Sequence, residues 1–117
     1  MNKTESDKVV LIVDDDLGFV MWLGQVLSQA GMLPFPAKNG EEGLSRIRDL
    51  HLTPDLAIVN PLVKNAAKLI RFLEPKTTVL TLDVPVPGSR GLMKRFGSEE
   101  PSAEKWIAKV KRAASGS

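Results

Sequence analysis

Short apolar runs alternate along the chain with segments in which apolar residues recur every three or four positions. Runs of four or five aliphatic, mostly β-branched residues are typical of strands buried on both faces of a parallel sheet. Recurrence at three or four positions is typical of helices that bury one side. The pattern predicts strands at 9–13, 33–37, 56–59 and 78–82, a weak strand at 92–96, and helices over 17–30, 39–50, 64–73 and 102–112.

Two segments depart from this simple alternation. Pro34 and Pro36 remove two ladder donors from strand 33–37, so this strand is expected at an edge of the sheet. Between Val84 and Gly91 the sequence carries two prolines and two glycines, so no helix is expected there. The helix that would join the fourth and fifth strands is therefore expected to be shortened or absent.

Strands that alternate with helices predict an α/β fold, a doubly wound parallel sheet covered on both faces through right-handed crossovers. A chain of 117 residues is long enough for one such domain and too short for two. We assign residues 9–114 to this domain, residues 1–8 to a flexible polar lead and residues 115–117 to a polar tail.

Five residues carry the signatures of helix ends. Asp16 and Asn39 are expected to cap the helices that follow them, with Glu42 as the capping-box partner of Asn39. Gly31 is expected to end the first long helix. His51 is expected to lie at an exposed helix end and to do no chemistry.

Composition excludes several kinds of site and partner. The absence of cysteine excludes disulfides and thiolate zinc sites, and a single histidine excludes a multi-histidine metal cluster. Sixteen basic and 14 acidic side chains leave a net charge of +2, too weak a bias to predict nucleic-acid binding. No apolar run approaches the roughly 20 residues that span a membrane, and the polar opening lacks the apolar core of a signal peptide. We therefore expect a cytoplasmic protein.

Polar residues follow the predicted strands at the edge where ligands are expected. In open parallel sheets the ligand site lies beyond the carboxyl ends of the strands. Those ends carry Asp14 and Asp15, then Asn60, then Asp83. These side chains are therefore the candidates for a functional site.

Three stretches, in this order and spacing, resemble landmarks of a known family. They are VLIVDDD at 10–16, NGEEGL at 39–44 and PDLAIVN at 54–60, and they resemble the receiver domains (CheY-like) of two-component response regulators. The resemblance covers residues 8–82 and resumes at 101–112. It implies a flavodoxin-like, five-stranded sheet in the order 2-1-3-4-5.

The resemblance also implies a metal site and a phosphoryl acceptor. In that family one Mg²⁺ lies among the acidic pair and the aspartate that ends the third strand, and this aspartate accepts a phosphoryl group from a partner's phosphohistidine. Carried over, the Mg²⁺ ligands are Asp14, Asp15 and the backbone of Leu62. The acceptor position holds Asn60, whose uncharged amide should not form an acyl phosphate. Phosphorylation there is not expected, and Mg²⁺ binding is expected to be weak or lost.

Two further positions depart from the family's pattern. A hydroxyl residue that ends the fourth strand and a lysine that ends the fifth hold the phosphate in that family. Alignment places Asp83 at the hydroxyl position, although a shift of two would place Thr81 there, and Glu100 at the lysine position. Carboxylates gathered at one site would repel a phosphoryl anion.

We interpret the chain as an atypical receiver domain of a phosphorelay, a phosphorylation-independent interaction module and no enzyme. The expected partner is a sensor kinase, another response regulator or an output protein, with a homodimer as a further option. No membrane partner is expected, and nucleic acid is not expected for this domain alone. One alternative is a small Mg²⁺-dependent phosphatase-like enzyme that uses Asp14 and Asp16, a pair resembling that of the haloacid dehalogenases. Another is a receiver fragment of a longer DNA-binding regulator.

Overall fold

The computed structural model of the chain describes residues 8–81 and 103–115. Within these residues, four strands and four helices follow one another along the chain. The strands are β1 (Val9–Val13), β2 (Leu33–Ala37), β3 (Leu56–Val59) and β4 (Thr78–Thr81), and the helices are α1 (Leu17–Gln29), α2 (Gly40–Leu50), α3 (Ala66–Leu73) and α4 (Ala103–Ser115). The strands and helices predicted for this part of the chain are confirmed, apart from shifts at their ends.

The four strands form one parallel sheet in the order β2-β1-β3-β4. Strand β2, with its two prolines, lies at an edge of this sheet, as predicted. The order confirms the α/β fold and the first four positions of the predicted order 2-1-3-4-5. The predicted strand at 92–96, and the segment 84–91 in which no helix is expected, lie outside the described residues.

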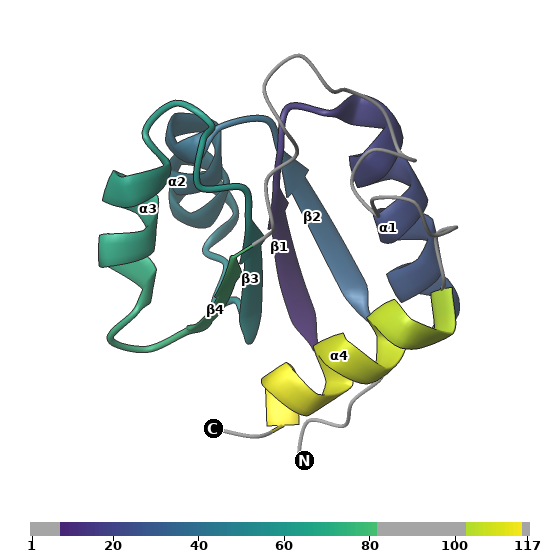
Figure 1. Cartoon of the computed structure of the whole chain (residues 1–117). Helices are drawn as coiled ribbons and strands as arrows, with labels where there is room; N and C mark the ends of the chain where they lie inside the picture. Colours follow the sequence, from purple (N-terminus) through teal and green to yellow (C-terminus); the bar gives the residue numbers. More distant parts are fainter. Residues whose placement is uncertain (1–7, 82–102, 116–117) are drawn as a thin grey trace.

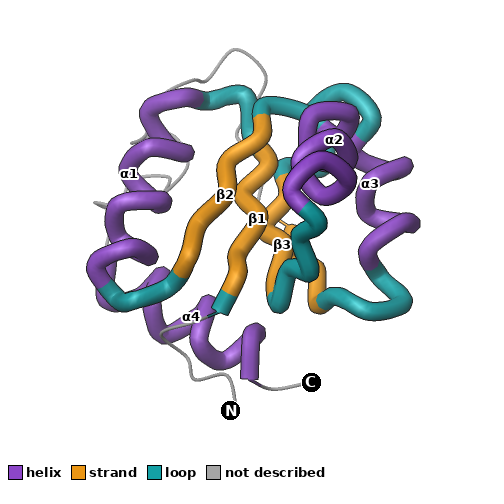
Figure 2. Tube along the Cα trace, turned by 180° about the vertical axis from the view of Figure 1, so that it is seen from behind, coloured by secondary structure: helices purple, strands orange, loops and turns teal. Residues whose placement is uncertain are grey.

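Both faces of the two central strands are buried, which explains their unbroken apolar sequences. Helices α1 and α4 cover one face of the sheet, and α2 and α3 cover the other (Figure 1, and from behind in Figure 2). Alternate strand residues supply the two cores: Val10, Ile12, Leu56 and Ile58 pack with Phe19, Leu23, Leu27 and Val110, whereas Leu11, Val13, Ala57 and Val59 pack with Ala66, Leu69 and Leu73.

The ends of α1 follow the sequence signatures. The Asp16 side chain accepts a hydrogen bond from the backbone N–H of Phe19 at 3.2 Å, and so caps the helix. At the other end, Gly31 adopts a left-handed conformation with φ 88°. The N–H of Met32 then donates to the carbonyl of Leu27 at 2.9 Å, which closes a Schellman-type turn. Both predicted helix ends are confirmed.

The ends of α2 confirm two predictions and correct a detail of a third. Asn39 caps the helix by accepting a hydrogen bond from the N–H of Glu42 at 2.8 Å. The Glu42 carboxylate accepts from the N–H of Lys38 at 3.0 Å, one residue before the cap, where a capping box would bond the N–H of Asn39. His51 ends the helix and is exposed, as predicted, and the structure adds that its backbone is left-handed at φ 53°.

Helix α3 begins at Ala66, two residues later than the apolar spacing predicts. Residues 61–65 form turns, and Asn65 has φ 61°, so the right-handed helix cannot extend back through it. At the end of the chain, α4 continues to Ser115, beyond the predicted end at Arg112. In the part of the chain that the structure describes, every helix is too short or too polar to cross a membrane.

Candidate functional site

The candidate site lies where β1 and β3 end side by side. The N–H of Asn60 donates to the carbonyl of Val13 at 2.9 Å, and the N–H of Asp14 donates to the carbonyl of Ala37 at 3.0 Å. Asp14 and Asn60 therefore occupy adjacent positions on neighbouring strands, which run about 4.8 Å apart in parallel sheets. Their exposed fractions are only 2% and 5%. The structure thus brings these two predicted site residues together in a buried position.

The three consecutive aspartates have different surroundings. Asp14 is buried, and its Oδ1 accepts a hydrogen bond from the backbone N–H of Asp16 at 2.9 Å. Asp16 in turn caps α1 through Phe19. Asp15 is exposed. The first and third carboxylates therefore hold the turn from β1 into α1, and the second faces solvent.

Asn60 organises the loop that follows β3. Its Oδ1 accepts from the N–H of Leu62 at 2.9 Å, and its backbone carbonyl accepts from the N–H of Val63 at 3.3 Å. Because only the oxygen of a side-chain amide accepts from an N–H group, the Nδ2 group must occupy the other arm of this amide. Residue 60 therefore presents a neutral donor on the arm that is turned away from Leu62.

Gly40 connects this loop to α2, a contact that the sequence patterns did not reveal. The N–H of Gly40 donates to the carbonyl of Lys64 at 2.8 Å. A Cβ atom at Gly40 would overlap the carbonyl group of Asn65. The sequence hints at this contact in one way: a glycine directly follows the helix cap, at a position where alanine has the higher helix propensity. The loop that begins at Asn60 is thus held at both of its ends.

The donor chemistry at this edge of the sheet fits a hard divalent cation held by few protein ligands. Mg²⁺ prefers oxygen ligands and keeps several waters, often binding through one or two carboxylates. Asp14 and Asp15 would supply the carboxylates, and the resemblance to receiver domains implies the backbone of Leu62 as a further ligand. Oδ1 of Asn60 already accepts from Leu62, and an amide nitrogen is no ligand for Mg²⁺. Within 8–81 and 103–115, no three acidic, histidine or cysteine side chains form a metal-binding group.

Two of the predicted site residues, Asp83 and Glu100, lie outside the described residues. Thr81, the other candidate for the hydroxyl position, is the last residue of β4 and is exposed. It is paired with Val59, directly before Asn60. The assignment of the hydroxyl position therefore stays a prediction.

No family model matches the sequence, and no curated protein matches it. Solved structures of receiver domains do match the fold. A response regulator receiver protein from Burkholderia phymatum aligns with a TM-score of 0.72 at 17% identity, covering 92% of this chain and 95% of that one. A CheY-like receiver domain protein from Methanospirillum hungatei aligns with a TM-score of 0.69 at 20% identity, covering 92% and 94%.

A third similar structure is a response regulator from Thermotoga maritima in complex with Mg²⁺ and BeF, with a TM-score of 0.63 at 22% identity, covering 91% of this chain and 98% of that one. These likenesses extend over nearly the whole of each chain. The chain therefore has the flavodoxin-like fold of the response regulator receiver domains.

Proposed function

We propose that this chain is a receiver module of a two-component system in which position 60 does not accept a phosphoryl group. The position of Asn60 is the main support for this proposal. Asn60 is buried at the carboxyl end of β3, beside Asp14, and its Oδ1 accepts a hydrogen bond from the Leu62 N–H. The module then acts through protein contacts, with a sensor kinase, another response regulator or an output protein as its partner.

The chemistry of the amide supports this proposal. A phosphoryl acceptor needs an oxygen with a lone pair and negative charge to attack phosphorus. The amide oxygen of Asn60 is uncharged, and the lone pair of its nitrogen is delocalised into the carbonyl. The oxygen is also occupied as the acceptor of a backbone hydrogen bond. Neither atom of the amide is a useful nucleophile.

The test is to incubate the protein with acetyl phosphate and Mg²⁺ and to measure its intact mass. The wild-type chain should gain no phosphoryl group, while a phosphorylatable receiver treated in parallel shows that the reagents work. Because the proposed module works without phosphorylation, a stable phosphoryl group on the wild-type chain, at Asn60 or at the aspartates beside it, would contradict the proposal.

The Asn60→Asp variant gives a second readout that does not depend on phosphoryl transfer. It places a third carboxylate beside Asp14, which is 2% exposed, and crowded buried carboxylates are costly without a cation. A cation that binds only the folded state stabilises it. We expect Mg²⁺ to raise the thermal midpoint of Asn60→Asp clearly more than that of the wild type. Equal shifts would show that residue 60 does not control the charge of this site.

The same hydrogen bonds weigh against a phosphatase that uses Asp14 and Asp16. Oδ1 of Asp14 accepts from the N–H of Asp16, and the Asp16 side chain accepts from the N–H of Phe19. Both side chains thus hold the turn into α1, a structural role that accounts for the Asp14 and Asp16 pair without catalysis. We expect no Mg²⁺-dependent turnover of p-nitrophenyl phosphate. Turnover that Asp14→Asn abolishes would instead support the phosphatase.

A further inference from the structure

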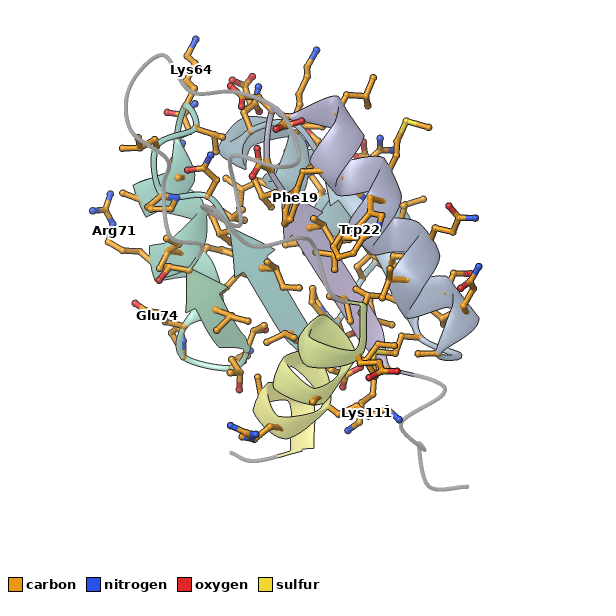
Figure 3. All side chains as sticks on the ribbon, turned by 45° about the vertical axis from the view of Figure 1, so that its right-hand side comes forward. Phe19, Trp22, Lys64, Arg71, Glu74 and Lys111 are labelled. Carbon is orange, nitrogen blue, oxygen red and sulfur yellow. The ribbon has the colours of Figure 1, made fainter. Side chains whose placement is uncertain are left out.

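Helix α3 carries a group of cationic side chains on its outer side. Lys68 and Arg71 lie one turn apart on this helix, and Lys64 lies in the turn before it. All three residues are exposed, and Figure 3 shows Lys64 and Arg71 projecting outward from the molecule. Within residues 8–81 and 103–115, the structure pairs none of the three with a carboxylate. The positive charge of this face is therefore available to a partner.

These cations do not stabilise α3 itself. Two like charges one turn apart repel each other, and the helix dipole disfavours cations near a helix N-terminus. Lys64 and Lys68 lie at that end of α3, where the first turn has no acidic residue and Asn65 makes no side-chain cap. Helix α2 shows the usual arrangement: Glu42 lies in its first turn, with Nη2 of Arg46 3.9 Å from its Oε1. A partner explains the charges of α3 better than the stability of the helix does.

Two apolar side chains flank the cations. Phe72, which is 59% exposed, lies one turn from Lys68, and the exposed Ala67 lies one turn from Arg71. Aromatic residues and arginine are enriched among the residues that anchor protein interfaces, and a small side chain lets a second helix approach closely. The outer face of α3 therefore combines a charged and an apolar contact within the eight residues of one helix.

The charge of this face selects an acidic partner. An uncharged partner would bury the cations without compensation, and a basic partner would repel them. The neighbouring helix α2 exposes Glu41 and Asp49, which would repel the phosphates of a nucleic acid or an anionic membrane laid across both helices. A single acidic helix, about 10–12 Å across, is narrow enough to lie on α3 alone. The surroundings therefore favour a helix over a broad anionic surface.

We propose that the outer face of α3 docks an acidic amphipathic helix of a protein partner. Carboxylates that recur at three or four positions on that helix match Lys64, Lys68 and Arg71. An adjoining apolar side chain of the partner covers Phe72. This docking rests on the proposed function in one respect, that the chain acts through protein contacts. It does not involve the chemistry of position 60, so the intact-mass test and the docking test can fail separately.

The test is titration of the full chain with a fluorescently labelled, alanine-rich peptide of about 20 residues, a length at which such a peptide forms a helix alone. Its glutamates recur every third or fourth residue on one face, with leucines beside them. We expect a dissociation constant on the order of 10 micromolar, as for small transient contacts. Affinity should fall about tenfold at about 1 M salt, where the Debye length is about 3 Å. The amide signals of Lys68, Arg71 and Phe72 should shift.

Three variants locate the contact. Arg71→Glu should weaken binding about tenfold, because it replaces an attraction with a repulsion, and Phe72→Ala should weaken it severalfold. The matched control is Arg112→Glu, the same exchange at an exposed arginine of α4, which covers the other face of the sheet. It should change affinity by less than about twofold. Because all three side chains are exposed, the circular dichroism spectra should match that of the wild type.

Failure of the peptide to bind overturns the proposal. Equal weakening by Arg71→Glu and Arg112→Glu does so too, because net charge alone would then account for binding. A control peptide of the same composition, with its glutamates spread around the helix, should bind more weakly, and equal affinity contradicts the docking. Tighter binding of a DNA duplex or of anionic lipid vesicles at α3 would assign the face to those ligands instead. Shifts of the α3 amide signals with the concentration of the chain alone would assign it to a second copy.

Discussion

Replacing Gly40 with alanine should destabilise the protein, although this exchange ordinarily strengthens a helix. Gly40 is the first residue of α2, and its N–H donates to the carbonyl of Lys64 at 2.8 Å. The added Cβ would overlap the backbone carbonyl of Asn65, which cannot rotate away as a side chain can. The loop after Asn60 and the start of α2 must therefore move apart.

The expected magnitude follows from three contributions. The helix gains about 1 kcal/mol from the higher propensity of alanine. The weakened hydrogen bond to Lys64 costs about 1 kcal/mol, and the forced backbone shift costs about 1–3 kcal/mol. The sum is a net loss of about 1–3 kcal/mol in the free energy of unfolding. The thermal midpoint should then fall by roughly 5–15 °C.

Denaturant unfolding followed by circular dichroism measures this loss, with two glycine exchanges as controls. At Gly43 the added Cβ would lie 2.9 Å from Cδ2 of Leu69, the flexible end of a side chain, so the change should stay within about 1 kcal/mol. At Gly18 the nearest atom, Oδ1 of Asp16, lies at 3.6 Å, an ordinary contact. Gly18→Ala should therefore stabilise by about 0.5–1 kcal/mol.

The ranking of the three variants decides the matter. If Gly40→Ala proves as stable as Gly18→Ala, the contact between α2 and the loop after β3 is wrong as described. A shift of the Asn60 and Leu62 amide signals in Gly40→Ala, absent in Gly18→Ala, would locate the perturbation in the site.

Two further predictions concern the caps of α2. Asn39→Ala removes the acceptor for the N–H of Glu42, so the free energy of unfolding should fall by about 1 kcal/mol. Asn39→Asp keeps an acceptor and should lose much less stability. If denaturant unfolding shows no loss of stability in Asn39→Ala, the cap does not contribute as described. His51 has a left-handed backbone at φ 53°, which glycine adopts without strain, so His51→Gly should raise the free energy of unfolding by about 1 kcal/mol. His51→Ala should bring no such gain. Equal thermal midpoints for the two variants would show that the backbone of His51 is not strained.

Much of the fold could be predicted because its determinants are local or periodic. The apolar runs of β1 and β3 mark strands buried on both faces, and the prolines of β2 mark an edge. The start of α3 could not be predicted in this way. Apolar spacing continues back toward Lys64, but Asn65 is left-handed and its carbonyl lies against Gly40, a contact between residues distant in sequence. Spacing within one segment carries no information about such a contact.

The same distinction applies to the site. The rule that ligands lie beyond the carboxyl ends of parallel strands was sufficient to place Asp14 and Asn60 side by side. The rule says nothing of which atoms are already engaged. That Asn60 holds the N–H of Leu62, and that Asp14 holds the N–H of Asp16, emerges only from the folded backbone.

These bonds separate what the fold requires at position 60 from what the chemistry requires. An aspartate has the same Oδ1 as an asparagine and would accept from the N–H of Leu62 equally well. The loop after β3 therefore does not require an amide. What an amide changes is the other arm of the side chain, which donates in place of carrying negative charge beside the buried Asp14. Since the hydrogen bond to Leu62 is available to either residue, the exchange Asn60→Asp keeps this backbone contact and changes only the charge beside Asp14, so it tests what the charge of this site does.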